Sequence, residues 1–127
     1  MLGDKPAAAT IAVSDMQRSR DFYGNTLGLS AVQDMDDAVL YGSGNTVVLV
    51  YQSQYAGTNK GTSASWAVGD DFDSVVEDLR QKGVTFEHYD DLPGTTRDGD
   101  IHTFDGMKAV WFKDPTGNIL NVGDVPM

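Results

Sequence analysis

The sequence contains no cysteine, which excludes disulfides, thiolate nucleophiles and cysteine-ligated zinc or iron–sulfur sites. It is also poor in histidine, because only His88 and His102 are available for imidazole chemistry. It has no run of about 18 apolar residues and no basic stretch followed by an apolar one, so we expect neither a membrane span nor an export signal. These absences fit a cytoplasmic protein, which is the location that we predict.

Basic residues are scarce as well: nine Lys and Arg stand against 19 Asp and Glu, a formal net charge of −10. Such a chain repels nucleic-acid phosphates and anionic lipid and attracts cationic ligands, so we expect no nucleic-acid or membrane partner. Short aspartate clusters lie at residues 34–37, 70–73 and 90–91. Aspartate is typical of turns and helix caps, and we interpret the clusters in that way, with capture of a cationic ligand as the alternative.

The remaining composition is that of one globular domain, with 127 residues of which 40% are hydrophobic. The sequence repeats itself weakly: laying residues 11–15 over 66–70 also aligns a serine and a glycine further along each copy. Each half is therefore predicted to be a βαβββ module, over about residues 6–57 and about 61–125. A module of about 60 residues buries little core alone, so we expect a single α+β domain over 1–127.

In the first half, alternation over Ala9–Val13 predicts a strand. Ser14 stands three residues before Gln17, which is the spacing of a capping box, and the helix that follows is expected to end at Gly28. The later strands of this half are predicted over Leu29–Asp34, Ala38–Tyr41 and Thr46–Gln52.

In the second half, Trp66 and Val68 are expected in a strand, Asp70 or Asp71 caps a helix, and Gly83 ends it. The later strands are predicted over Thr85–Tyr89, Ile101–Phe104 with Ala109–Phe112, and Ile119–Val122.

Two motifs resemble those of a known superfamily. The stretch Val13–Tyr23 followed by Leu27–Leu29 is similar to the "VxDxxxSxxFY…LGL" opening of the vicinal oxygen chelate superfamily, and Trp111–Leu120 resembles its closing "F-x-DP-x-GN" hairpin. That superfamily includes glyoxalase I, type I extradiol dioxygenases, fosfomycin resistance enzymes, methylmalonyl-CoA epimerases and bleomycin resistance proteins. The resemblance implies a curved, mostly antiparallel sheet groove with helices on its outer face. It does not specify the activity, because this fold hosts lyases, epimerases, transferases, dioxygenases and non-catalytic binders.

The resemblance also implies where metal ligands would stand, two from each half. The corresponding residues here are Ala8, Leu49, Ser63 and Asn121. Alanine and leucine offer no lone pair, and neutral serine and asparagine oxygens bind divalent ions poorly without a carboxylate or imidazole beside them. We therefore expect no metal and no cofactor, as in the bleomycin resistance branch, which by resemblance sequesters its drug in the groove of a dimer.

Strand alternation indicates which side chains line the groove that the resemblance implies. If Ala8 and Ser63 point into it, the residues two places further on do so too, and Trp66 faces the helix. The hairpin pattern places Trp111 in the groove and Phe112 in the core. The predicted ligand-binding residues are Thr10, Leu49, Tyr51, Ser63, Ser65, Trp111 and Asn121. This aromatic and hydroxyl-bearing set suits a flat aromatic ligand; the alternative is a collapsed groove that Tyr51 and Trp111 fill.

The histidines offer a further possibility. His102 is expected in a polar loop or strand and exposed to solvent, and the alternative is a general base that Asp98, Asp100 or Asp105 orients. His88 is expected on a strand without a catalytic role. No catalytic residue is assigned apart from His102 in that alternative.

Two classes of function follow. The first is a metal-independent, homodimeric protein that sequesters an aromatic or cationic small molecule such as an antibiotic. The alternative is a lyase, isomerase or dioxygenase acting on a small metabolite, with a metal held by other groups or with His102 as an acid–base catalyst. A scaffold with a vestigial groove is a third possibility.

Overall fold

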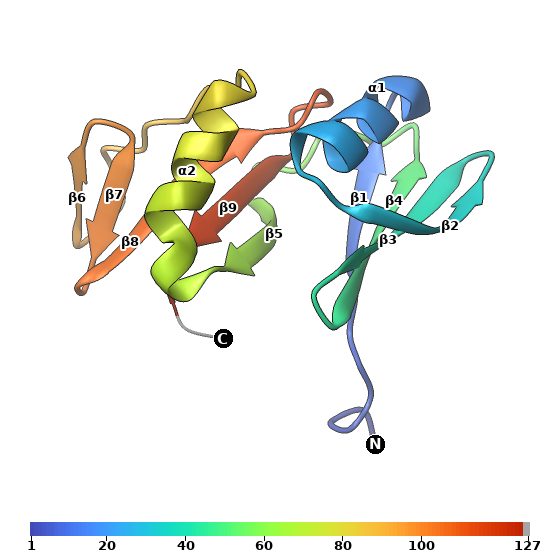
Figure 1. The fold of residues 1–127 in the computed structure, drawn as a ribbon, viewed down its shortest axis with the longest axis horizontal. Helices are drawn as coiled ribbons and strands as arrows, with labels where there is room; N and C mark the ends of the chain where they lie inside the picture. The colour runs from blue at the N-terminus through green and yellow to red at the C-terminus, as the bar shows by residue number, and fades with distance from the viewer. Residues whose placement is uncertain (126–127) are drawn as a thin grey trace. The chain divides into compact units, whose positions relative to one another are not determined.

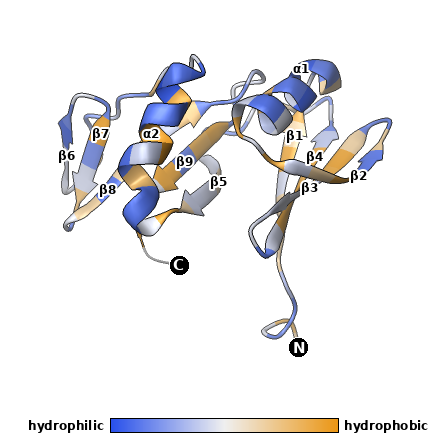
Figure 2. Cartoon of the chain, viewed as in Figure 1, coloured by the Kyte–Doolittle hydropathy of each residue, from blue (hydrophilic) through white to orange (hydrophobic). Residues whose placement is uncertain are grey.

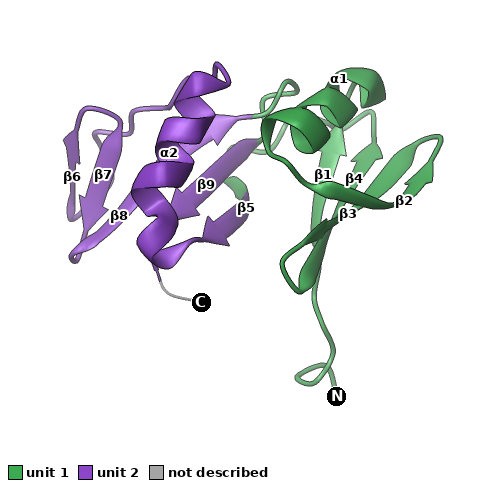
Figure 3. Cartoon of the chain, in the orientation of Figure 1, with its two compact units in different colours: residues 1–63, 114–118 green, residues 64–113, 119–127 purple. Residues whose placement is uncertain are grey.

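The computed structural model describes residues 1–125 and contains two β-sheets and two α-helices (Figure 1). Residues 126–127, the end of the predicted domain, lie outside the described part. The chain divides into two compact units, residues 1–63 with 114–118 and residues 64–113 with those from 119 onward (Figure 3). Two successive modules of strands and a helix confirm the predicted α+β class. Among the described residues, no helix is long and apolar enough to cross a membrane.

The first sheet has four strands in the order β1-β4-β3-β2. β1 (Ala9–Val13) runs parallel to β4 (Thr46–Gln52), whereas β3 (Ala38–Ser43) is antiparallel to both β4 and β2 (Ser30–Met35). β1 and β4 have the predicted bounds. In β1 the larger apolar residues alternate with small ones, and in β4 they form a continuous run.

The helix of the first unit begins at a different cap from the predicted one. α1 (Met16–Arg20) starts after Asp15, whose carboxylate accepts a hydrogen bond from the Arg18 N–H at 3.1 Å, and continues as the π-helical segment η1 (Asp21–Thr26). The capping-box prediction for Ser14 is therefore wrong. Asp15 is extended and immediately precedes the helix, so its carboxylate is the group that reaches the free N–H groups of the first turn.

The hairpin motif of residues 114–118 belongs to the first unit and is built around Asp114, which is only 5% exposed. One carboxylate oxygen of Asp114 accepts hydrogen bonds from the backbone N–H groups of residues 116–118 at 2.8–2.9 Å. The other accepts from the Tyr23 hydroxyl at 2.7 Å and from the Asn118 amide at 2.9 Å. The same amide also donates to the Ala12 carbonyl at 2.7 Å, so the motif ties the hairpin to β1 and to the helix.

The second sheet has five strands in the order β5-β9-β8-β7-β6. A short 3₁₀ turn, η2 (Gly69–Asp71), precedes α2 (Phe72–Gln81), which buries Phe72, Val76 and Leu79. In Figure 2, most of α2 is coloured as hydrophilic and most of β9 as hydrophobic. The strands are β5 (Thr62–Ala67), β6 (Thr95–Asp98), β7 (Ile101–Phe104), β8 (Met107–Lys113) and β9 (Ile119–Gly123).

One strand prediction for this half is wrong, and one strand was not predicted. Residues 85–89, all within the described part, form no strand, and Phe86 makes only an isolated bridge to Phe112. The unpredicted strand β6 instead pairs with β7. Its sequence Thr-Thr-Arg-Asp has no apolar alternation, so pairing with a neighbouring strand rather than burial defines it.

Candidate functional site

The first sheet has one face in the core of its unit and one open face. Ile11 and Val13 on β1 are 1% and 0% exposed, and Val48 and Val50 on β4 are buried with them. The alternate residues Thr10, Leu49 and Tyr51 therefore share the open face. The register supports this assignment, because Thr10 lies opposite Leu49 and Ala12 lies opposite Tyr51. Ala8, just before β1, is exposed.

On the second sheet, Trp111 and Asn121 form a directly opposed pair on β8 and β9. Val110 and Phe112 beside Trp111 are 0% and 1% exposed, which confirms Phe112 in the core, whereas Trp111 is half-buried on the other face. The Asn121 amide donates to the Val110 carbonyl at 3.2 Å, which fixes its side chain. The sheet thus presents one large aromatic side chain next to one amide.

The two predicted serines lie on β5. Ser63 and Ser65 share one face by alternation, and the Ser63 hydroxyl accepts a hydrogen bond from the Asn59 amide at 3.2 Å. Trp66 alternates with them and shares its face with the buried Ala64.

His102 lies in an aromatic cluster, which we define as Tyr89, His102 and Trp111. Its side chain is only 1% exposed, so the expectation of a solvent-exposed histidine is wrong. Its ring stands edge-to-face against Trp111, with centroids 4.8 Å apart, and Tyr89 lies 6.0 Å from His102 and 5.7 Å from Trp111. The aspartates at 98, 100 and 105 suggested a polar loop, and the sequence did not indicate that β6 would pair with β7 beside His102.

Hydrogen bonding defines the tautomer of His102. The backbone N–H of Tyr89 donates to Nε2 of His102 at 3.0 Å, so a neutral His102 carries its proton on Nδ1. Among the described residues, neither Nδ1 of His102 nor the buried hydroxyl of Tyr89 has a hydrogen-bond partner. Burial is the main cause that lowers the pKa of His102; the Ala109 backbone opposes it, and Arg97 and, more weakly, His88 lower the pKa further against an opposing contribution from the Asp100 backbone. His102 is therefore neutral at pH 7.

Charged residues surround the cluster. His88 lies in the irregular segment and bonds through Nε2 to Asp100 at 2.8 Å, so its predicted place on a strand is wrong. The same carboxylate pairs with Arg80 at 3.1 Å, and these two partners lower the pKa of Asp100, His88 more strongly. Asp100 therefore orients His88 and not His102, which removes the carboxylate partner expected for a general base. Arg97 pairs with Asp90 at 2.7 Å, and this hydrogen bond lowers the pKa of Asp90.

The residues at the family's metal-ligand positions do not fit a divalent ion. Ala8 and Leu49 are hydrocarbon side chains, and the Ser63 and Asn121 side chains are engaged with Asn59 and Val110. Over residues 1–125, no group of three or more His, Asp or Glu side chains comes together in a metal-binding arrangement. A carboxylate or imidazole would have to enter from elsewhere to complete such a site.

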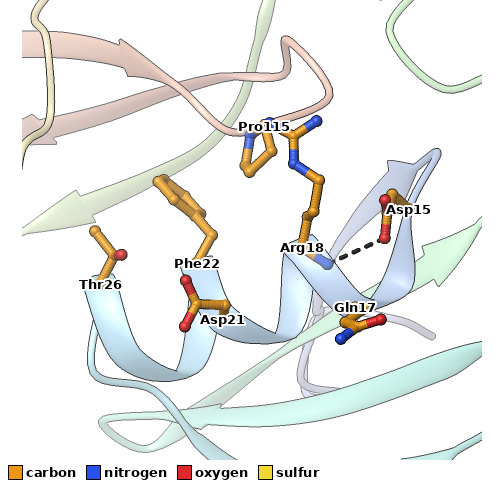
Figure 4. A pocket seen from close by; sticks show the side chains of 7 residues that line it. All are labelled: Asp15, Gln17, Arg18, Asp21, Phe22, Thr26 and Pro115. Atoms are coloured by element: carbon orange, nitrogen blue, oxygen red, sulfur yellow. Dashed lines mark hydrogen bonds between the residues drawn. The ribbon is translucent and has the colours of Figure 1, made fainter.

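A polar pocket of about 380 Å³ lies beside the helix of the first unit (Figure 4). In the figure, the Arg18 side chain extends toward Pro115. The lining residues are Asp15, Gln17, Arg18, Asp21, Phe22, Thr26 and Pro115, a set that shares no member with the predicted ligand-binding residues. Two carboxylates beside one guanidinium, in an open depression, leave no clear preference for a ligand charge.

The comparisons with known proteins identify the class. The profile of the glyoxalase/bleomycin resistance protein/dioxygenase superfamily matches residues 5–122. The chain therefore belongs to that superfamily, which confirms the resemblance seen in its two motifs. Comparison with curated proteins gives no match.

Solved structures share the fold at low sequence identity. A glyoxalase family protein from Enterococcus faecalis has a TM-score of 0.72 and 19% identity over 97% of this chain and 99% of its own. Lactoylglutathione lyase from Agrobacterium tumefaciens has a TM-score of 0.71 and 18% identity over 97% and 95%. Fosfomycin resistance protein FosX from Mesorhizobium loti has a TM-score of 0.68 and 13% identity over 100% of this chain and 95% of its own. Identities this low establish the fold alone.

Proposed function

We propose that this protein sequesters a small aromatic compound, including cationic ones such as some antibiotics, without using a metal. The observation that carries the proposal is the half-buried Trp111, on the face of β8 opposite to Val110 and Phe112, next to Asn121 and in contact with His102 and Tyr89. A large indole that a buried cluster holds in place loses little freedom when a flat ligand stacks on it.

Further side chains support an aromatic ligand. The open face of the first sheet carries Tyr51, Leu49 and Thr10, and β5 carries Ser63 and Ser65; these are the further side chains that we propose as ligand contacts. Offset stacking contributes about 1 kcal/mol for each good aromatic pair, in addition to buried area. The net charge of −10 raises the local concentration of a cationic ligand.

The metal-independent part of the proposal depends on donor chemistry. The four positions at which relatives would hold a metal carry alanine, leucine, serine and asparagine here. Relatives whose names describe a lyase or a resistance protein share only the fold at these identities, so their chemistry does not transfer directly.

Removal of the indole tests the ligand proposal. A compound from a panel of flat aromatic molecules, bleomycin among them, is first identified by calorimetry, and its affinity is then measured for Trp111→Ala. We expect a loss of about 2 kcal/mol, roughly thirtyfold, as for a buried aromatic hot spot. Trp66→Phe is the matched control, because Trp66 shares a face with the buried Ala64 and not with the proposed ligand contacts on β5. This substitution should leave the affinity unchanged. Equal affinity of the Trp111→Ala protein would contradict the proposal.

Metal analysis separates this function from the enzymatic alternative. The purified protein is dialysed and its metal content measured by mass spectrometry, with and without a chelator. We expect less than one metal ion for every ten chains or so, because the donor set lacks a carboxylate and an imidazole. A stoichiometric transition metal that survives dialysis would favour a lyase, isomerase or dioxygenase.

We also propose that the protein is a cytoplasmic homodimer. β2 stands at the edge of its sheet and is exposed along its whole length, with Val32 at 64% and Met35 at 42%. Apolar side chains on an exposed edge strand are usually covered in solution. Light scattering coupled to size exclusion should give twice the 13.7 kDa chain mass, and a monomer at all concentrations would contradict the dimer.

A further inference from the structure

We propose that His102 is a positioning residue for Trp111: neutral His102 holds the indole in the orientation that binds ligand, and protonated His102 releases it. The statement about the indole concerns the aromatic cluster alone. The consequence for ligand binding rests on the proposed function, and the two are tested separately below.

The first step is the hydrogen bond that fixes the ring. A neutral imidazole has one nitrogen that accepts and one that donates, and Nε2 of His102 is committed as the acceptor for the Tyr89 N–H at 3.0 Å. A second proton would be added at Nε2, because Nδ1 already carries one. Two N–H groups would then face each other, so protonation and this hydrogen bond exclude each other.

The second step connects that hydrogen bond to Trp111. The His102 and Trp111 rings are 4.8 Å apart and nearly perpendicular, at 88°, and Tyr89 touches both rings. Next to Tyr89, the Glu87 N–H donates to the Trp111 carbonyl at 2.7 Å, so the segment carrying Tyr89 is bonded to the backbone of Trp111 itself. His102 is 1% exposed, and a ring this enclosed cannot turn without displacing Trp111 or Tyr89.

The third step is the charge around His102. On β6, Arg97 lies directly opposite His102, and the carboxylate of Asp90 engages Arg97. On the segment before β6, His88 is bonded to Asp100, which also pairs with Arg80 of α2. Arg97 and His88 disfavour a positive charge on His102. The carboxylate of Asp90 pairs with Arg97, and that of Asp100 pairs with His88 and Arg80. The charged and titratable groups around the cluster are Arg80, Glu87, His88, Tyr89, Asp90, Arg97 and Asp100.

These three steps predict an optical signature of protonation. An imidazolium beside an indole quenches its emission, whereas neutral imidazole quenches it much less. In a Trp66→Phe background, which leaves Trp111 as the single tryptophan, emission is recorded from pH 8 to pH 4.5 while circular dichroism monitors the fold. We expect one step with its midpoint below the ordinary histidine value of about 6.5.

Two glutamine variants assign that step. His102→Gln keeps an acceptor for the Tyr89 N–H and does not titrate, so the step should disappear. His88→Gln removes the other histidine, and the emission step should remain in this variant. A step that persists in His102→Gln, or a folded protein with no step, would overturn the inference. If His102→Gln does not fold, the imidazole ¹⁵N shifts of the unsubstituted protein decide, because a proton on Nε2 at pH 7 contradicts the proposed hydrogen bond.

The ligand arm uses 9-aminoacridine, a flat aromatic cation, measured by calorimetry between pH 7 and pH 5. We expect the affinity to fall by up to about tenfold for each pH unit below the midpoint, as coupling to one proton requires, and to stay constant in His102→Gln. The same pH dependence in both proteins would overturn the coupling. If the emission step is present but 9-aminoacridine and the aromatic panel do not bind at pH 7, the proposed function fails while the positioning of Trp111 stands.

Discussion

Two buried hydroxyls on the first helical segment differ in the partners that the fold provides. The Tyr23 hydroxyl donates to Asp114 at 2.7 Å, and burial together with this carboxylate raises the pKa of Tyr23 far above its usual range. The Ser19 hydroxyl is buried without a hydrogen-bond partner among the described residues. Both residues belong to the opening motif, so one buried hydroxyl of the motif has a carboxylate partner and the other has none among the described residues.

Tyr23→Phe should destabilise the protein by about 1–3 kcal/mol, because it leaves a buried carboxylate oxygen with one donor fewer. The measurement is urea unfolding at pH 7, with the free energy extrapolated to water.

Ser19→Ala is the matched control, since it also removes one buried hydroxyl from the same segment. Because no partner is lost, we expect a change within about 0.5 kcal/mol or a small gain in stability. A loss as large as that of Tyr23→Phe would show that Ser19 has a partner in solution.

At the scale of elements, the caps and edges depart from the sequence pattern while the buried elements follow it. The helix of the first unit starts after Asp15 and not at the predicted cap, and the second helix follows the 3₁₀ turn Gly69–Asp71. The extra strand β6 and the irregular segment 85–89 lie at one side of the second sheet. Edges and caps are decided by one or two hydrogen bonds, which a hydrophobic pattern does not record.

The cap prediction follows from this correction. Asp15→Ala removes the acceptor of the Arg18 N–H and should lower the free energy of unfolding by about 1 kcal/mol. Ser14→Ala should have a smaller effect, because the N–H of Ser14 rather than its side chain makes the shorter contact with Thr116, at 3.1 Å. Thermal and urea unfolding of both variants checks the order, and a larger loss for Ser14→Ala would restore the capping box.

At the scale of the whole molecule, charge determines how the protein responds to pH. The chain carries a formal charge of −10, so acidification first relieves repulsion among carboxylates. It also protonates groups that the fold keeps in one charge state. His102 is kept neutral by burial, while Asp90 and Asp100 are kept ionised by Arg97, His88 and Arg80.

The sign of the His102 contribution follows from its lowered pKa. The unfolded chain protonates His102 below about pH 6.5, while the folded chain does so only at lower pH, so acidification in that window stabilises the unfolded state. Stability from this residue is present above about pH 6.5 and is lost as the pH falls through the folded pKa.

The corresponding measurement compares unfolding free energies at pH 7.5 and pH 5.5 for the unsubstituted protein and His102→Gln. The decrease should be smaller in the variant. Asp90 and Asp100 take up protons only below about pH 4, so they do not contribute to the pH dependence in this window. An equal decrease in both proteins would assign the pH dependence to other groups.

The sequence by itself determined the class, the two-module pattern and most strands, and it indicated the faces of β1, β4 and β8. Alternation placed Thr10, Leu49 and Tyr51 together and separated Trp111 from Phe112, because the period of a strand is a local property of the backbone.

Only the tertiary structure decided the state of His102. The residues next to it in the sequence, Ile101 and Thr103, do not indicate burial, yet β6, Tyr89 and Trp111 pack around its ring, and a backbone N–H selects its tautomer. The tertiary structure likewise brought Tyr23 to Asp114 from a distant part of the chain. Burial and hydrogen-bond partners depend on residues far apart in sequence, and a local pattern of residue types does not contain that information.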